Sequence, residues 1–429
     1  MDSISKARAA LFKLVRLRTG YSLQNVESDT GKKASLISDM ERFKKAIPDD
    51  FIAKAFRSFG TEFSFDYSND VETILSLIHQ YIRYLYYIND PKLAVIENQL
   101  ENYHFDYLSD YDDRFYYLLT LEALVLVSTY QNEQTVRLID GLKDRIDTLL
   151  DAYPVLPPFI KDVINLICGI YYNSLRDFKT SLSYLNNLNS MSPESNDERY
   201  LNPIARYFQL KNQVFLHHPM QAYKLIPIVR NELNNDRNYQ RLFNLDRLEA
   251  IYFISIGEYE LANQKLVECT ESMHNLGLFF LDDINLENRV WCSLMLGRYE
   301  ESLDLIEKIE SELEFNPASN CIFKTYCLYQ LNRQEDCKQA IEPYKPFRKL
   351  ITGLHESIML METLIFHKPS VFIKQALRFS DQMIKRNEIY IASFFLQMAK
   401  DQAESVFDYQ SLYTIYQKLY ALRQSSQSG

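Results

Sequence analysis

Gly257-Glu-Tyr-Glu-Leu-Ala262 recurs 40 residues later as Gly297-Arg-Tyr-Glu-Glu-Ser302. A Gly-x-Tyr-x-x-small pattern in helical sequence is typical of the turn between two antiparallel helices. The Gly takes the tight turn, the Tyr packs over it, and the small residue lets the helices approach. One copy would indicate an ordinary helix turn, but two copies in register predict repeated helix pairs. Chains of this kind usually present a binding surface rather than a catalytic centre.

The same spacing continues in both directions with relaxed residue types. Before the two clear copies, the turn position falls at Asn89, Gln131, Arg176 and His217, and after them at Asn332 and Asn387. The pattern is best defined from Arg176 to Asn332. The last step, from Asn332 to Asn387, is 55 residues long and predicts either an insertion or a misplaced turn. The repeat resembles the tetratricopeptide repeat, although the steps here are longer than that family's.

Composition agrees with an all-α chain, because only 10 of the 429 residues are Gly and apolar residues are spread throughout. No run of 18 apolar residues occurs, and residues 1–20 lack the apolar core of a signal peptide, so we expect a cytoplasmic protein without a membrane partner. The six Cys form no Cys-x-x-Cys pair, which predicts buried free thiols.

Charge separates the first 60 residues from the rest of the chain. Residues 1–60 hold 12 Lys and Arg against 7 Asp and Glu, a balance of +5, whereas the remainder holds 35 against 50, a balance of −15. A small basic head on an acidic body indicates that the head binds a polyanion. We therefore expect three parts: a head over 1–65, a repeat domain over 66–423 and a disordered tail over 424–429.

The head has the pattern of a helix-turn-helix. A helix over Lys6–Thr19 carries Ala7, Ala10, Leu11, Leu14 and Val15 on one face, Ser22 can cap a second helix, and Gly31 allows a sharp turn. A third helix over Lys33–Arg42 directs Ile37 and Met40 inward, and a fourth begins at Pro48-Asp49.

These residues resemble the Cro/repressor-type helix-turn-helix, in which an Arg on the first helix pairs with a Glu ending the third. Arg16 and Glu41 occupy those places. The chain differs from the family pattern at Leu23, where a phosphate-contacting Gln is common, and at Glu27, where a small residue is usual. The DNA-binding residues expected around the third helix are Lys32, Lys33, Ala34, Ser35, Ser38, Arg42 and Lys44. The alternative is a small helical cap on the repeats that never touches DNA.

A repressor-type head followed by a right-handed tetratricopeptide-like α-solenoid resembles the Rap–Rgg–NprR–PlcR–PrgX peptide-pheromone receptors of Gram-positive bacteria. The resemblance implies a quorum-sensing transcription regulator that binds double-stranded DNA as a homodimer and holds a short signalling peptide in its concave groove. The alternative is a Rap-like protein-interaction solenoid whose head does not bind DNA.

The repeat pattern also predicts which side chains line that groove, since the first helix of each pair faces inward. Asn and Lys or Arg can hold a peptide's backbone and carboxylate, while Trp and Tyr offer apolar walls with a polar edge. The predicted ligand residues are Asn173, Tyr207, Lys211, Asn244, Arg247, Glu287, Trp291 and Tyr326. For each of them, packing between repeats is an equally good interpretation.

Enzyme chemistry finds little support in the sequence. No phosphate-binding Gly-rich loop, His-Glu-x-x-His or Gly-x-Ser-x-Gly motif occurs, and the seven His form no metal-ligand cluster beyond the adjacent His217 and His218. We therefore expect no catalytic residues, no metal and no cofactor.

Overall fold

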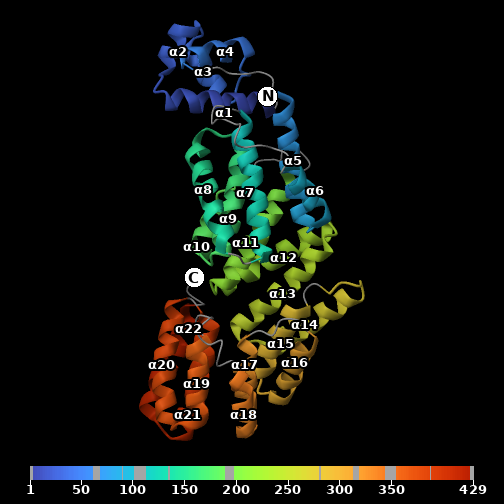
Figure 1. Cartoon of the computed structure of the whole chain (residues 1–429), viewed down its shortest axis with the longest axis vertical. Helices are drawn as coiled ribbons and strands as arrows, with labels where there is room; N and C mark the ends of the chain where they lie inside the picture. The colour runs from blue at the N-terminus through green and yellow to red at the C-terminus, as the bar shows by residue number, and fades with distance from the viewer. Residues whose placement is uncertain are drawn as a thin grey trace. The chain divides into compact units, whose positions relative to one another are not determined.

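A computed structural model of the chain describes residues 3–60, 68–88, 90–100, 113–133, 136–188, 198–279, 282–312, 318–343, 354–386 and 388–425. Throughout these ranges the regular structure is helical (Figure 1). The chain divides into two compact units. Unit 1 comprises residues 1–212 and 228–241, and unit 2 comprises residues 213–227 and 242–429.

The first four helices form the predicted head, within unit 1. They are α1 (Ser3–Arg18), α2 (Leu23–Thr30), α3 (Ala34–Glu41) and α4 (Asp49–Ser58). Gly31 follows α2 with a φ of 76°, in the left-handed region where Gly is favoured, and its N–H donates to the carbonyl of Glu27. Val26, Ile52 and Phe56 meet in the core of the head with Ile37 and Met40, the two residues predicted to face inward.

Helix α1 is buried on two faces, which is more than the predicted apolar face accounts for. Leu11, Phe12 and Val15 belong to the core of the head. Ala10 and Leu14, together with Leu11, line a small gap against the first repeats, whose walls are Tyr116, Tyr117, Val155 and Leu156. Figure 1 shows α2, α3 and α4 gathered on one side of α1 and the repeats on the other. Helix α1 therefore joins the head to the repeats within unit 1.

The remaining helices follow one another in antiparallel pairs. From the N-terminal side they are α5 (Ser68–Tyr87), α6 (Asp90–Leu100), α7 (Asp113–Glu133), α8 (Val136–Ala152), α9 (Pro158–Ser174), α10 (Phe178–Asn186), α11 (Leu201–Phe215), α12 (Pro219–Asn235), α13 (Tyr239–Ile256) and α14 (Tyr259–His274). They continue with α15 (Asp282–Met295), α16 (Tyr299–Glu312), α17 (Ala318–Gln330), α18 (Gln334–Ile341), α19 (Leu354–Phe366), α20 (Pro369–Lys385), α21 (Ile389–Ser405) and α22 (Tyr409–Ser425). Two short 3₁₀ turns, η2 (Tyr153–Val155) and η3 (Glu198–Tyr200), precede α9 and α11.

Helix contacts have the order of a solenoid. In unit 1, α5 packs against α6 and α7, and α7 packs against α8 and α9. In unit 2, α15 packs against α16 and α17, and α17 packs against α18 and α19. Each pair thus buries its apolar side against the next pair, as in tetratricopeptide-like repeats. The predicted fold class, an all-α chain with repeated helix pairs, is confirmed.

The predicted turn residues confirm the repeat pattern between Arg176 and Asn332. Five successive turn positions have positive φ: 60° at Arg176, 56° at His217, 85° at Gly257, 73° at Gly297 and 58° at Asn332. Non-Gly residues rarely adopt this conformation, so its recurrence at the predicted positions identifies one repeated turn.

The small residue that follows each of these turns is fully buried. This holds at Ser181, Ala222, Ala262, Ser302 and Cys337. Two of them reach the partner helix with their hydroxyls: Ser181 Oγ donates to the Gly169 carbonyl at 2.5 Å, and Ser302 Oγ donates to the Val290 carbonyl at 3.5 Å. A Cβ at Gly169 would overlap the side chain of Leu185, so the helices of this pair approach too closely for a larger residue.

Outside that range the turn pattern needs correction. Gln131 lies inside α7, so the turn predicted there is wrong. The turn after α5 has its positive φ at Ile88, while Asn89 and Asn387 lie outside the described residues. The long last step contains the additional pair α19–α20, whose second helix begins at Pro369 instead of a Gly-x-aromatic turn. At the far end, α22 includes Gln424 and Ser425 of the predicted tail, and residues 426–429 lie outside the described residues.

Candidate functional site

The predicted pairing of Arg16 with Glu41 is confirmed. Arg16 Nε donates to Glu41 Oε1 at 2.6 Å and its Nη2 donates to Oε2 at 3.0 Å, while Nη1 donates to the Tyr21 carbonyl at 2.7 Å. The two residues are only 7% and 6% exposed. Such a two-pronged buried ion pair fixes the angle between helices better than a single contact does. It locks the end of α3 to α1 and to the chain entering α2.

Smaller contacts set the geometry of α2 and α3. Ser22 caps α2, because its Oγ accepts from the Asn25 N–H at 3.1 Å. Lys54 Nζ on α4 donates to the Thr30 carbonyl at 3.2 Å, which holds the end of α2 just before the Gly31 turn. These contacts fix α2 and its end beside α3, which lies on the surface of the head.

The predicted DNA-binding residues lie on that surface. Lys33, Ser35, Arg42 and Lys44 are exposed, whereas Lys32, Ala34 and Ser38 are partly buried. The inner side of α3 is filled by Ile37 and Met40. The structure therefore presents one side of α3 and its two ends to the solvent, and contact of these residues with DNA stays a prediction.

Glu27 has a role that the sequence pattern did not reveal. Its Oε2 accepts from the Ala34 N–H at 2.9 Å, so the carboxylate caps the N-terminus of α3. A negative charge there offsets the partial positive charge of the helix end. The departure from the family pattern at this position has a structural effect, namely an acidic group beside the helix that would read DNA.

In unit 1, the predicted groove residue Asn173 takes part in a buried network. Its Nδ2 donates to Asn212 Oδ1 at 2.5 Å, and Asn212 Nδ2 donates to Ser181 Oγ at 2.8 Å. The network joins α9, α10 and α11. These contacts favour packing between repeats over ligand binding for Asn173.

Tyr207 and Lys211 are the other predicted groove residues in unit 1. Tyr207 is buried, and the guanidinium of Arg241 lies 5.3 Å from the centre of its ring. Lys211 is partly exposed, with its Nζ 5.7 Å from the centre of the Phe208 ring. Of the three, Lys211 is partly exposed, whereas Asn173 and Tyr207 are buried.

In unit 2, Arg247 has the environment expected of a ligand residue. It is partly exposed on α13, and its buried Nε makes no hydrogen bond within the described part of the chain. The neighbouring acids on α13 are already engaged, since Lys265 Nζ lies 3.5 Å from Asp246 and 3.0 Å from Glu249. A buried donor without an acceptor is costly unless a ligand supplies one. Asn244, one helical turn before Arg247, is also partly exposed.

Glu287 is a partly buried carboxyl on α15, the first helix of the next pair. Burial raises the pKa of Glu287 above its ordinary value, and the nearby Asp283 carboxylate raises it further. A carboxyl in this state gains from a cationic partner, because a positive charge restores the favourable environment of the ionised form.

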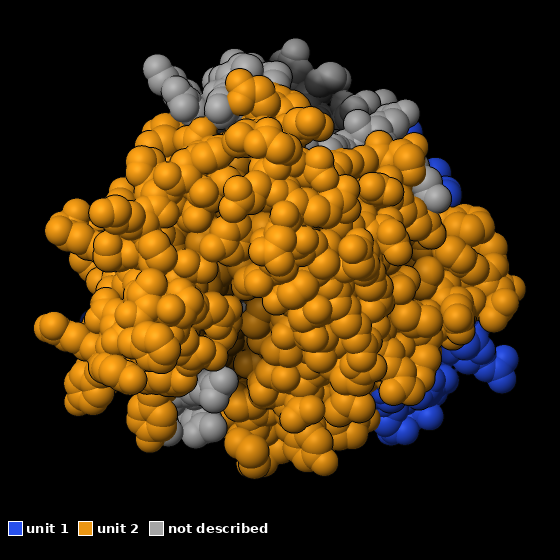
Figure 2. Space-filling model, turned by 90° about the horizontal axis from the view of Figure 1, so that it is seen from below, with its two compact units in different colours: residues 1–212, 228–241 blue, residues 213–227, 242–429 orange. Residues whose placement is uncertain are grey.

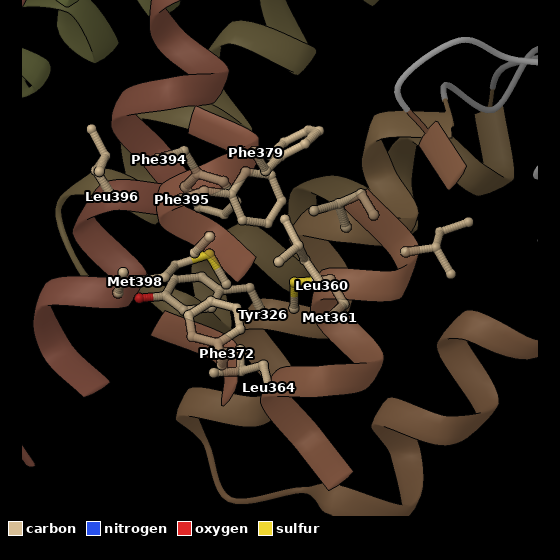
Figure 3. Close-up of a cluster of buried hydrophobic side chains, with 14 of the residues drawn as sticks. Tyr326, Leu360, Met361, Leu364, Phe372, Phe379, Phe394, Phe395, Leu396 and Met398 are labelled. Atoms are coloured by element: carbon tan, nitrogen blue, oxygen red, sulfur yellow. The ribbon is translucent and has the colours of Figure 1, made fainter. Parts of the chain in front are cut away.

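Trp291 and Tyr326 are brought together by residues that the sequence pattern missed. Their rings lie 5.5 Å and 5.3 Å, respectively, from the ring of Phe394 on α21, and Trp291 also contacts Phe323 at 5.6 Å between ring centres. Figure 3 shows Tyr326 within a cluster of buried side chains from α19, α20 and α21. Tyr326 therefore contributes chiefly to packing, whereas Trp291 is partly exposed and keeps the edge of the cluster accessible.

The surface of unit 2 is hollowed near the middle of the face seen in Figure 2. A hollow of about 230 Å³ lies between α19 and α20. Its lining is His355, Glu356, Met359, Leu360, Gln375, Arg378, Phe379 and Gln382.

The described helices include none with the length and apolar character of a bilayer-crossing segment. In the same ranges, no three His, Cys, Asp or Glu side chains gather as a metal site. The six cysteines are free and buried, as predicted.

Fold and site together define an all-α protein in which a small helical head precedes tetratricopeptide-like repeats. No family model and no curated protein matches the sequence. The fold is similar to that of a Rap protein in complex with competence and sporulation factor. The TM-score is 0.65 at 13% identity, over 83% of this chain and 99% of that one. It is also similar to the apo form of the quorum sensor NprR from B. thuringiensis, with a TM-score of 0.62 at 15% identity, over 83% and 99% of the two chains. NprR in complex with its cognate peptide NprX gives a TM-score of 0.58 at 15% identity, over 85% and 100%. At these identities the likeness shows a shared fold.

Proposed function

We propose that this protein is a cytoplasmic transcription regulator of the peptide-pheromone receptor class, which binds double-stranded DNA as a homodimer under the control of a short signalling peptide. The observation that carries the proposal is the buried Arg16–Glu41 pair, which holds α3 on the surface of a basic head. The proposed role is regulatory, without catalysis.

The DNA-binding part of the proposal rests on the side chains around α3. Lys33 and Ser35 are exposed at the start of α3, and Arg42 is exposed at its end. In helix-turn-helix proteins the start of the recognition helix meets base edges in the major groove, and nearby cations meet phosphates. A single recognition helix reads only a few base pairs, so useful specificity needs two heads on two half-sites about 34 Å apart or a multiple of it.

The peptide-binding part rests on unit 2 and on the shared fold. The solved structures of similar fold include a Rap protein with competence and sporulation factor and NprR with the peptide NprX. In this chain, Arg247 offers a donor suited to a carboxylate, and Glu287 offers a partly buried carboxyl suited to an ammonium group. Trp291 supplies a partly exposed aromatic surface beside Glu287 on α15. A short peptide presents all three chemistries: two opposite charges and apolar side chains.

One observation favours a second candidate, a protein-interaction solenoid whose head does not bind DNA. The carboxylate of Glu27 caps α3 at its start, the end that would enter the major groove between the two phosphate backbones. A negative charge at that point repels phosphate. In this alternative the head serves only to cover the first repeats through α1.

A salt-dependent mobility shift of promoter DNA by the purified full chain separates the two candidates. The proposal predicts a shift that weakens steeply as salt rises, because Lys and Arg release counterions from phosphates. Glu27→Gln should strengthen the shift, since the amide oxygen can still accept from Ala34 while the charge is removed. If neither the wild type nor the Glu27→Gln variant shifts DNA at low salt, the interaction solenoid is supported.

A further inference from the structure

Helix α22 carries a row of exposed tyrosines that neither proposed site uses. Tyr409, Tyr413, Tyr416 and Tyr420 are 73%, 66%, 51% and 64% exposed. Their spacing of four, three and four residues places them in one stripe along the helix, the spacing of the contact seam in helix pairs. We call these four residues the tyrosine stripe.

The tyrosine stripe is a second apolar face of α22, because another face already anchors the helix. Ile415 is fully buried in the core cluster formed with α19, α20 and α21, and Leu412, Leu419 and Leu422 pack against that cluster. At about 100° per residue, this anchoring face and the tyrosine stripe are separated by about 110° around the helix. The tyrosine stripe is therefore not needed to hold α22 in place. Large exposed aromatic patches on soluble proteins usually mark an interaction surface.

Charge indicates which partner the stripe fits. The whole chain has a net charge of −10, so two copies repel each other over most of their surfaces. The four tyrosines are uncharged, and so are the exposed residues Gln410 and Gln417 on the same helix. A carboxylate beside the stripe, that of Glu404 on α21, accepts a hydrogen bond from the Tyr416 hydroxyl at 3.2 Å. Lys418, the basic residue within the stripe's span, is already paired with Asp381. A neutral aromatic seam lacks the charge complementarity that a basic or acidic partner would require, but it complements a second copy of itself.

The exposed area is sufficient for such a contact. Tyrosine side chains present roughly 200 Å² each, so at the observed exposures the stripe offers about 500 Å² per chain. Two stripes packed together would bury about 1,000 Å², the lower bound for a specific interface before flanking residues are added.

We propose that the tyrosine stripe of α22 is an interface between two copies of this chain. The two α22 helices would pack antiparallel about a two-fold axis, with Tyr413 and Tyr416 nearest the axis and Tyr409 opposite Tyr420 of the other copy. This interface deepens the proposed function and rests on it, because it supplies the dimer that two DNA half-sites require.

Sedimentation velocity of the full chain, without DNA or peptide, tests the proposal. The wild type should sediment as a dimer that dissociates on dilution. Tyr413→Glu with Tyr420→Glu should raise the dimer dissociation constant at least about tenfold, because each change places a charge in the buried seam. Tyr413→Phe with Tyr420→Phe should preserve the dimer, since the aromatic surface remains.

The matched control is Gln410→Glu with Ala421→Glu. It adds the same charge at exposed positions of α22, about 100° away from the stripe, and should leave the dimer intact. Thermal melts of all variants show whether each chain is folded. A monomeric wild type, a stripe variant that stays dimeric, or equal dissociation of the control would overturn the proposal, whatever else covers the stripe.

The same measurement separates this inference from the proposed function. A chain that dimerises through the stripe but shifts no promoter DNA contradicts only the DNA-binding role. A chain that binds DNA while its stripe variant remains dimeric contradicts only the interface.

Discussion

The backbone carbonyl of Tyr86 accepts a hydrogen bond from Arg241 Nε at 2.6 Å across 155 residues of sequence. Arg241 Nη2 also donates to the Leu85 carbonyl at 2.6 Å, and Asn238 Nδ2 donates to the Tyr86 carbonyl at 2.6 Å. The side chain of Tyr86 completes the contact, since its hydroxyl donates to Asp236 Oδ2 at 2.9 Å. The turn between α12 and α13 thus caps the C-terminal end of α5 within unit 1, where helix carbonyls lack partners of their own.

We predict that Arg241→Met destabilises unit 1 by about 2–6 kcal/mol. The change removes the guanidinium from two carbonyls, at roughly 1–3 kcal/mol each. Hydrogen exchange should accelerate in α5 more than in α15 or α17. Arg199→Met is the matched control, because Arg199 is half exposed and lies 3.9 Å from Asp236, and it should change stability by less than about 1 kcal/mol. Equal effects of the two changes would show that Arg241 does not cap α5.

A second prediction concerns the ion pair that holds the head. Glu41→Ala should lower the free energy of unfolding of the head by about 3–5 kcal/mol, because Arg16 remains buried and charged without its partner. Hydrogen exchange should show unfolding of α2 to α4 while the helices of unit 2 keep their protection. The control is Glu260→Ala, which removes an exposed ion pair with Arg298 at 2.7 Å. It should lower the free energy of unfolding by less than about 1 kcal/mol. Unchanged protection of α2 to α4 in Glu41→Ala would remove the structural role of the pair.

Lys33 and Ser35 should contribute to sequence-specific DNA binding. We predict that Lys33→Ala with Ser35→Ala weakens binding to the specific operator by about 1–3 kcal/mol for each base-edge hydrogen bond removed, and binding to random DNA by less. Fluorescence anisotropy with both duplexes measures the difference. Equal weakening on the two duplexes would assign these residues to phosphate contacts instead.

Arg247 should contribute to peptide affinity without affecting the head. Loss of a charge-assisted hydrogen bond costs about 1.5–3 kcal/mol, so Arg247→Ala should weaken peptide binding roughly 10- to 100-fold. Lys265→Ala is the control, since Lys265 is already paired with Asp246 and Glu249. Calorimetry on both variants, and on Lys211→Ala, checks the assignment. Wild-type peptide affinity in both Arg247→Ala and Lys211→Ala would place the ligand elsewhere.

The raised pKa of Glu287 makes stability depend on pH. Burial favours the protonated carboxyl in the folded protein, so the group's stabilising contribution is present at low pH and is lost as pH rises through the folded pKa. Glu287→Gln should therefore raise the melting temperature at pH 7 but not below the ordinary glutamate pKa of about 4.3. Melting curves from pH 4 to pH 8 measure the difference. A variant less stable than the wild type at pH 7 would indicate that Glu287 has a cationic partner in the folded chain.

The sequence predicts the repeats where their signal is local. Between Arg176 and Asn332 each turn residue lies five positions before a fully buried small residue, and both features can be read from neighbouring residues. The pair α19–α20 escapes the pattern because Pro369, rather than a Gly-x-aromatic turn, begins its second helix. The turn predicted at Gln131 is misplaced because α7 continues to Glu133.

Contacts between distant residues account for most of what the sequence pattern could not reveal at the candidate sites. The Arg16–Glu41 pair is predictable because the family resemblance specifies both positions. Capping of α5 by Arg241, and the packing of Phe394 against Trp291, join residues far apart in the chain that leave no periodic signal. The pattern alone therefore does not show that Asn173 and Tyr326 take part in packing between helices.

The most direct test of peptide-controlled DNA binding is the operator affinity of the purified chain with and without its peptide. The peptide is first recovered from the protein purified from its own cells, identified by mass spectrometry and synthesised. We predict that saturating peptide changes the operator dissociation constant by about 5- to 150-fold, in either direction, and that Arg247→Ala shifts this change to higher peptide concentration. An operator affinity that is the same with and without bound peptide would contradict peptide control.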